Sequence, residues 1–175
     1  MKLLTFTVPC FNSEGYLSKC VDSLLAGGDD VEIILVDDGS TDGTAAMADE
    51  YERKYPSIVK AVHKENGGHG SAVNTGLEHA TGLFFKVVDS DDWVKESAYR
   101  QILDILRELA GGEQALDMFI SNFVYEKEGE KKNKVMSYRH ALPENRIFTW
   151  NEVRHFHKGQ YILMHSVIFR TRLLK

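Results

Sequence analysis

Three carboxylates stand within four positions, at Asp89, Asp91 and Asp92, soon after a hydrophobic run that begins at Leu83. Such a run predicts a buried strand, and residues i and i+2 of a strand point the same way, so Asp89 and Asp91 are predicted to project together from its end. Carboxylates this close repel one another unless a cation lies between them. Hard oxygen ligands suit Mg²⁺ or Mn²⁺, which also bind substrate phosphates. The alternative is an acidic loop that caps the next helix.

Polar, aromatic and glycine residues follow the other apolar runs. They are Pro9, Phe11 and Asn12 after the first run, Asp37 and Asp38 after the second, and Asn66 and Gly67 after the third. A ligand of an open parallel sheet binds outside the carboxyl ends of the strands, so these residues are predicted to meet the acidic cluster at one edge. There the ring could stack on a nucleobase, and a carboxylate could accept hydrogen bonds from the base or ribose. The alternatives are a core aromatic at Phe11, a turn residue at Asp38 and an ordinary glycine loop.

Four apolar runs alternate with segments of helical pattern, which is typical of a parallel α/β sheet. The runs that predict strands span residues 3–8, 31–36, 58–62 and 83–88. The predicted helices run from residue 12 or 13 to 25, from an N-cap at Ser40 or Thr41 to a stop at Pro56, and over 70–79 and 96–109. The apolar stripe of the first helix includes Tyr16.

The pattern changes beyond residue 113. The predicted elements there are a strand over 118–125, a solvated charged loop over 126–134, a hairpin partner over 135–138, a short helix over 151–157 and a strand over 162–170. Residues 1–112 are therefore expected to form one half of a domain and residues 113–175 the start of a second half. Because no terminal signal marks the end at Lys175, we expect the chain to be the N-terminal part of a longer protein.

The composition limits the classes of function. The chain has 175 residues, of which 43% are hydrophobic, and a formal net charge of −5. This length suits one well-buried domain, and the negative charge argues against general nucleic-acid binding. Cys10 and Cys20 lack the spacing of a metal site, so reduced thiols are expected. The apolar start is too short for a signal peptide and no run approaches about 20 apolar residues, so a cytoplasmic location is expected.

Other nucleotide-binding folds require motifs that this sequence lacks. The first strand is followed by residues 9–15 without a G-x-G-x-x-G pattern, and no G-x-x-x-x-G-K-[ST] occurs. A phosphatase with an aspartyl nucleophile needs paired aspartates after its opening strand, whereas the cluster here follows the fourth. A nucleoside diphosphate held through a metal is therefore the predicted ligand.

Four segments in order resemble a known family. They are residues 7–12 (TVPCFN), 35–42 (LVDDGSTD), 66–76 (NGGHGSAVNTG) and 88–93 (VDSDDW). Together they resemble family 2 glycosyltransferases of the GT-A fold, and 162–170 is similar to bacterial members that build capsular or other surface polysaccharides. The resemblance implies a Rossmann-like, mostly parallel sheet flanked by helices. It also implies a nucleotide-sugar-binding half over 1–112 and a smaller antiparallel acceptor-side portion from 113.

The resemblance also implies roles for individual residues. Asp89 would face the ribose, and Asp91 would bind Mn²⁺ or Mg²⁺ together with Asp89. Asn74 would help to shape the sugar pocket. The implied donor-binding residues are Pro9, Phe11, Asn12, Glu14, Asp37, Asp38, Asn66, Gly67, Asn74, Asp89 and Ser90.

The implied reaction is transfer of a sugar from a UDP-sugar with inversion. A divalent ion would stabilise the leaving diphosphate, and a carboxylate base would take the proton of the acceptor hydroxyl. In the family this base lies downstream of a stretch like 162–174, so we expect it beyond Lys175. His165 is a candidate on the metal or acceptor side, and its alternative is a structural role in an apolar strand.

Two other functions stay open at this point. A nucleotide-sugar-binding module without turnover would fit the missing base. A sugar nucleotidyltransferase also pairs an α/β sheet with aspartates and a metal, although the basic, glycine-rich loop expected after its first strand is missing here. The family implies a saccharide or lipid-linked acceptor, and peripheral contact of the full-length protein with the inner face of the membrane.

Overall fold

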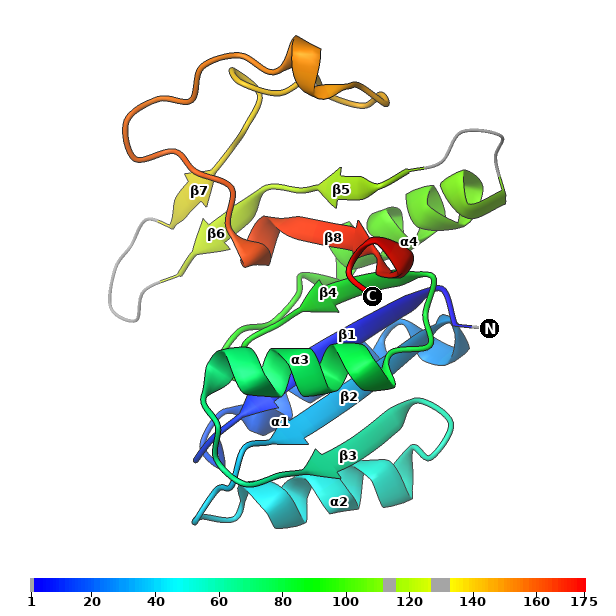
Figure 1. Ribbon diagram of the computed structural model, residues 1–175, viewed down its shortest axis with the longest axis vertical. Coiled ribbons are helices and arrows are strands. Elements are labelled where there is room, and N and C mark those ends of the chain that lie inside the picture. Colours follow the sequence, from blue (N-terminus) through cyan, green and yellow to red (C-terminus); the bar gives the residue numbers. More distant parts are fainter. Residues whose placement is uncertain (1, 112–115, 127–132) are drawn as a thin grey trace.

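The computed structural model describes residues 2–111, 116–126 and 133–175, and its centre is a six-stranded sheet of order β3-β2-β1-β4-β8-β5 (Figure 1). The strands are β1 (Leu4–Cys10), β2 (Val31–Asp37), β3 (Val59–His63), β4 (Phe84–Val87), β5 (Met118–Ile120) and β8 (Val167–Arg170). Strands β1 to β4 are parallel, and β8 runs antiparallel to both β4 and β5. The predicted mostly parallel α/β sheet is therefore confirmed.

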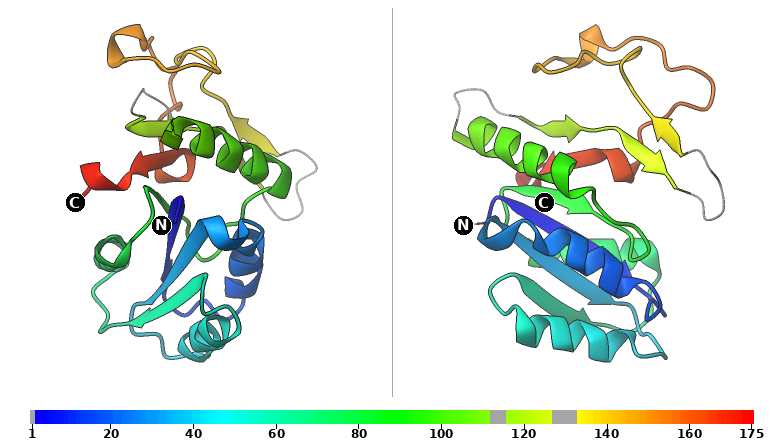
Figure 2. Two further views of the ribbon diagram at one scale, coloured as in Figure 1. Left: turned by 90° about the vertical axis from the view of Figure 1, so that its right-hand side faces the viewer. Right: turned by 180° about the vertical axis from the view of Figure 1, so that it is seen from behind.

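Helices cover both faces of this sheet. They are α1 (Leu17–Leu25), α2 (Thr44–Lys54), α3 (His69–His79) and α4 (Glu96–Gly111). Figure 2 shows α3 on one face and α1, α2 and α4 on the other. Helices α1, α2 and α3 each connect two parallel strands, so the carboxyl ends of β1 to β4 meet at one edge. No helix in the described ranges has both the length and the apolar character needed to cross a membrane.

Apolar side chains fill the space on both faces because the central strands are buried on both sides. Every residue of β1 is buried. One apolar cluster joins Phe6 and Val8 to α1, α2 and α4, and another places Ile34 and Phe85 against α3. Burial of apolar surface contributes about 25 cal/mol per Å². The strand ends that carry the polar residues are therefore anchored in a rigid core.

Helix α2 begins later than predicted. Its first residue is Thr44, and neither Ser40 nor Thr41 is its N-cap. These two residues bond to other parts of the loop region instead: the Ser40 amide donates to Asp37 Oδ1 at 3.1 Å, and the Thr41 amide donates to Asn12 Oδ1 at 2.8 Å. Side-chain acceptors that lie outside the helix therefore delay its start.

The strand predicted over 118–125 is two strands in two sheets. β5 ends at Ile120, and β6 (Phe123–Tyr125) belongs to a separate two-stranded sheet. Between them the Ser121 amide donates to Ser166 O at 2.8 Å. This partner lies far along the chain, so no local pattern marks the break.

The smaller sheet is the predicted hairpin. β6 pairs antiparallel with β7 (Lys134–Met136), which confirms the hairpin predicted with a partner over 135–138. Of the charged loop predicted over 126–134, residues 127–132 lie outside the described ranges. Figure 1 shows β6 and β7 beside β8 and β5, and the segment after β7 beyond them at the top of the view.

The helix predicted over 151–157 is only a 3₁₀ turn at Trp150–Glu152. The chain leaves the helical path because the Arg154 amide donates to Ala141 O at 2.8 Å rather than to a carbonyl four residues back. A tertiary partner therefore replaces the local one.

The strand predicted over 162–170 is shortened to β8. A 3₁₀ turn at Met164–Ser166 precedes it, in which the Ser166 amide and hydroxyl both donate to Leu163 O, at 3.0 and 2.7 Å. A side-chain bond of this kind competes with strand pairing. The turn takes His165 out of the strand in which it was predicted to lie.

Candidate functional site

The carboxyl ends of β1, β2 and β4 and the start of α3 enclose a cleft of about 500 Å³. Of the residues predicted to bind donor or metal, those that line it are Pro9, Phe11, Asp38, Asn66, Asp89, Ser90 and Asp91. The further lining residues are Cys10, Ser13, Tyr16, Gly68, His69 and Ala72. The predicted residues outside this lining are Asn12, Glu14, Asp37, Gly67 and Asn74, of which Asn74 is exposed on α3.

Two aromatic rings are exposed at this cleft. Phe11 is 52% exposed and Tyr16 is 51% exposed. The alternative of a core aromatic at Phe11 was therefore wrong, and so was the assignment of Tyr16 to the buried stripe of the first helix. Exposed rings beside polar groups offer faces on which a nucleobase can stack.

Asp38 is buried and binds the glycine-rich loop. Its carboxylate accepts hydrogen bonds from the Lys64 ammonium at 2.6 Å and from the amides of Gly67 and Gly68 at 2.9 and 2.7 Å. Burial alone would raise the pKa of Asp38, but these donors outweigh it and hold the pKa below its usual value. Gly68 has a φ of 85°, which favours glycine. Asp38 therefore shapes the loop whose Asn66 and Gly68 line the cleft.

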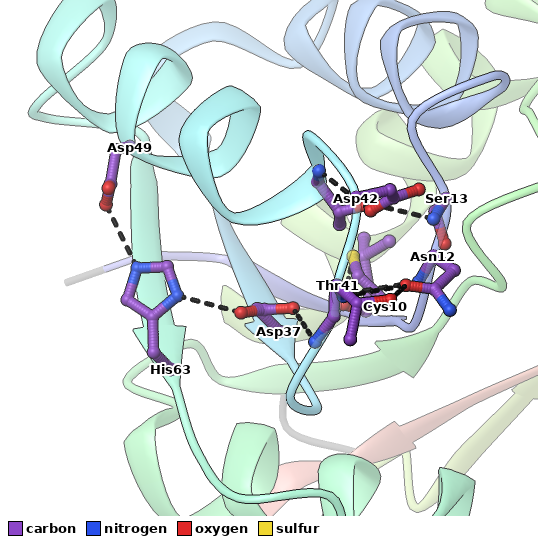
Figure 3. A network of polar contacts seen from close by, with 11 residues as sticks. Cys10, Asn12, Ser13, Asp37, Thr41, Asp42, Asp49 and His63 are labelled. Carbon is purple, nitrogen blue, oxygen red and sulfur yellow. Dashed lines mark hydrogen bonds and ion pairs between the residues drawn. The ribbon is translucent and has the colours of Figure 1, made fainter.

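Asp37 is held by a histidine to which the sequence assigned no role (Figure 3). His63 Nδ1 lies 3.1 Å from Asp37 Oδ2, and His63 Nε2 lies 3.0 Å from Asp49 Oδ1 on α2. Hydrogen bonds to Asp37 and then to Asp49 raise the pKa of His63 above its usual value. Asp37 is therefore a fixed, buried carboxylate behind the cleft rather than part of its lining.

The stabilising contribution of His63 is expected to depend on pH. Because the folded-state pKa of His63 is raised, the contribution is fully present below the unfolded value of about 6.5 and is lost as the pH rises through the raised value. The substitution His63→Asn should therefore lower the free energy of unfolding more at about pH 5.5 than at about pH 9 in urea denaturation. The matched control is His155→Asn at an exposed position. Equal losses for His63→Asn at both pH values would contradict the prediction.

Asn12 and Glu14 join the loop after β1 to the loop after β2. The Asn12 amide donates to Ser40 Oγ at 3.0 Å, and Glu14 Oε2 accepts the Gly43 amide at 3.0 Å. These long-range bonds keep the segment in a loop, so α1 begins at Leu17 and not at residue 12 or 13 as predicted. The Asn12 amide and the Glu14 side chain thus hold the walls of the cleft, and neither residue lines it.

The acidic cluster lies in a turn rather than at the end of a strand. β4 ends at Val87, and the Asp92 amide donates to Asp89 O at 2.9 Å. Strand alternation therefore does not orient Asp89 and Asp91, and that basis for their common direction was wrong. Asp91 is exposed in the cleft, and Asp89 Oδ1 lies 2.8 Å from His69 Nε2 at the start of α3.

Asp92 and His165 join Asp89 in a group that can hold a metal ion. Each offers one ligand atom, and these atoms lie within 4.8 Å of one another. His165 Nδ1 is buried 3.1 Å from Asp92 Oδ2, yet it makes no hydrogen bond of acceptable geometry with the described residues. The Asp92 carboxylate raises the pKa of His165, and Asp89 adds to this effect. Two carboxylates and an unbonded imidazole nitrogen fit a divalent cation.

The sequence could not bring this group together. It placed Asp92 in the acidic cluster without a role of its own, and it named His165 as a candidate on the metal or acceptor side without a partner, in a predicted apolar strand. The two residues meet because β8 lies beside β4 in the sheet. A histidine next to a strand is common, so no local signal marked His165 as the partner of Asp92.

The family model described as "Glycosyl transferase family 2" matches residues 5–171 of this chain. The chain belongs to this family. This glycosyl transferase family 2 chain is 30% identical over 165 residues to the uncharacterized glycosyltransferase EpsJ of Bacillus subtilis (strain 168). The aligned region covers 91% of this chain and 45% of EpsJ. It is also 35% identical over 104 residues to the minor teichoic acid biosynthesis protein GgaB of the same strain, over 58% of this chain and 12% of GgaB. The chain thus spans less than half of these two relatives.

A solved structure shares this family 2 fold. The crystal structure of S. aureus TarS 1–349 in complex with UDP-GlcNAc matches with a TM-score of 0.72 and 27% identity, over 99% of this chain and 46% of the TarS chain. The match includes the mostly parallel sheet and the antiparallel strands beside it. The chain therefore has the GT-A fold, as the resemblance implied.

Proposed function

We propose that this chain is the donor-binding part of a glycosyltransferase that moves a sugar from a UDP-sugar, with inversion, to a saccharide or lipid-linked acceptor in surface polysaccharide synthesis. One observation carries the proposal: the exposed ring of Phe11 and the carboxylates of Asp89 and Asp91 line the same cleft. A ring for a base and carboxylates for a metal-bound diphosphate are what a nucleotide sugar requires. The UDP-GlcNAc bound by TarS and the teichoic acid pathway of GgaB support the donor and the product class.

The nucleotide part of the donor would occupy the cleft of the half formed by residues 1–112. Phe11 would stack on the base, Asp38 would lie toward the nucleoside with Asp37 supporting it from behind the cleft, and Asp89 and Ser90 would face the ribose. The remaining donor-binding candidates would frame the cleft or its sugar end, and they are Pro9, Asn12, Glu14, Asn66, Gly67 and Asn74. Residues 113–175 would begin the acceptor-side half.

A divalent cation would bind at the acidic turn. Asp89, Asp92 and His165 would hold it, and Asp91 is the further carboxylate at the cleft. Such an ion stabilises the negative charge of a leaving diphosphate as a Lewis acid. An imidazole ligand favours Mn²⁺ over Mg²⁺, because Mg²⁺ prefers a near-ideal octahedral shell of oxygens.

The carboxylates that line the cleft do not include a free base for the acceptor hydroxyl. The carboxylates in the cleft lining are Asp38, Asp89 and Asp91. The Asp38 carboxylate already accepts three hydrogen bonds. Asp89 and Asp91 are assigned to the nucleotide sugar and the metal ion. This favours a second candidate, a nucleotide-sugar-binding module without turnover. In the leading proposal the base lies beyond Lys175, and transfer takes place in the cytoplasm at the inner membrane face.

Calorimetric titration of UDP into the chain, with Mn²⁺ and again with EDTA, tests the donor site. We expect UDP to bind at least about 10-fold more tightly with Mn²⁺, because residues of the acidic turn would hold the ion and its charge would offset that of the diphosphate. Equal affinity in both conditions would contradict the metal-dependent site, and no binding in either would contradict the donor proposal.

Release of UDP from a UDP-sugar separates the candidate functions. Release that depends on a saccharide acceptor would exclude the binding module, whereas binding without release would favour it. Formation of diphosphate from a sugar phosphate and a nucleoside triphosphate would instead indicate a nucleotidyltransferase.

A further inference from the structure

We infer that Lys86 is a positioning residue that fastens the backbone of Met164–Val167 to β4 and thereby holds the His165 imidazole against Asp89 and Asp92. The inference rests on the proposed function, because it concerns the metal side of the same cleft. It assigns a role to a residue that the proposed function leaves without one.

The contacts of Lys86 are unusual for a lysine. Its ammonium donates to His165 O at 2.8 Å, to Val167 O at 3.3 Å and to Met164 O at 3.4 Å. Among the described residues, no carboxylate lies within ion-pair distance of it. Burial penalises the ammonium group of Lys86. A largely buried charge is costly unless it is hydrogen-bonded, and here backbone carbonyls carry that compensation.

Lys86 acts where the backbone ladder of the sheet stops. β4 and β8 pair only at Phe84 with Arg170 and at Phe85 with Phe169. The next residue of β4 is Lys86, which has no backbone pair on β8. Its side chain reaches the turn at Met164–Ser166 and donates hydrogen bonds there instead. One ammonium group thus links the parallel and antiparallel parts of the sheet next to this pairing.

The position of His165 depends on this turn. Its ring lies 5.5 Å from the ring of Phe123 and its Nδ1 lies 3.1 Å from Asp92 Oδ2. The backbone carbonyl of His165 is the nearest acceptor of the Lys86 ammonium group. This hydrogen bond therefore holds the backbone from which the His165 imidazole extends. Residues that orient a metal ligand typically change metal affinity by about 10- to 100-fold when they are replaced.

Lys86→Met tests the inference, because Met keeps much of the side-chain length and removes all three hydrogen bonds. We would measure the Mn²⁺ dissociation constant without nucleotide from the electron paramagnetic resonance signal of free Mn²⁺, and hydrogen exchange of the amides of 164–167. The expected results are a loss of about 10-fold in Mn²⁺ affinity and faster exchange. UDP binding in EDTA should be unchanged.

Thr171→Val is the matched control. It removes a buried hydrogen bond from Thr171 Oγ1 to Gly82 O, 2.6 Å long, at the other end of the same β4–β8 junction. It should destabilise the fold without changing the Mn²⁺ affinity. In combination with His165→Gln, Lys86→Met should cause little further loss of Mn²⁺ affinity, because the lysine acts through His165.

The outcomes separate the inference from the proposed function. Mn²⁺ affinity and exchange that are unaffected by Lys86→Met would overturn the inference alone. A wild-type chain that binds UDP but not Mn²⁺ would overturn both the inference and the metal part of the proposed function. If Lys86→Met fails to fold, the shorter Lys86→Gln must show the same loss of Mn²⁺ affinity.

Discussion

Replacing Asp89 by Asn is expected to abolish the metal-dependent part of UDP binding and to weaken Mn²⁺ binding by at least about 100-fold. Asp89 lines the cleft and also belongs to the group with Asp92 and His165, so it is common to the predicted and the observed carboxylate sets. Asn keeps the size of the side chain and removes its charge. Calorimetry of UDP in Mn²⁺ and in EDTA would then give equal affinities for the variant.

The control for this substitution is Asp29→Asn, which removes an exposed carboxylate far from the cleft. Asp91→Asn and Asp92→Asn, measured without nucleotide, separate the two neighbouring carboxylates. We expect the larger loss of Mn²⁺ affinity for Asp92→Asn, since Asp92 is the one grouped with Asp89 and His165. An Asp89→Asn variant that kept metal-dependent UDP binding would refute the proposed site.

Replacing Asp38 by Asn is expected to destabilise the fold by about 2 kcal/mol and to weaken UDP binding as well. The change leaves the Lys64 ammonium without its carboxylate and places an amide group against the amides of Gly67 and Gly68. Breaking a fully buried pair costs about 3 to 5 kcal/mol, and the cost is smaller here because the Lys64 side chain is 20% exposed. Urea denaturation and UDP calorimetry measure the two effects.

Asp104→Asn serves as the control, because the Asp104 side chain is 73% exposed on α4 and should contribute little. A double-mutant cycle of Asp38→Asn with Lys64→Met isolates the pair, and a favourable coupling is expected. An Asp38→Asn variant with unchanged stability but lost UDP binding would instead show that Asp38 contacts the nucleoside directly, as the sequence alone predicted.

The parallel part of the fold was predictable because its signals are local. Apolar runs of strand length at 31–36 and 83–88 lie within one residue of β2 and β4. The helices predicted over 70–79 and 96–109 likewise lie within two residues of α3 and α4. The helical and strand periods show which side chains are buried away from water. This pattern can be read from a short stretch of sequence. The break at Ser121 depends on a distant partner. The turn at Met164–Ser166 is closed locally by Ser166 and contacted by the distant Lys86, and the apolar pattern of 162–170 predicted neither break.

The candidate site divides in the same way. The sequence by itself determined that Phe11, Asp38 and the acidic cluster would meet, because residues that follow parallel strands must share one edge of the sheet. Only the tertiary structure decided what each group touches. It turned Asp38 toward the glycine loop and brought His165 to Asp92. The physical reason is that a hydrogen bond or a metal site depends on distances of a few ångströms between residues far apart in the chain. Only the packing of the folded chain sets those distances.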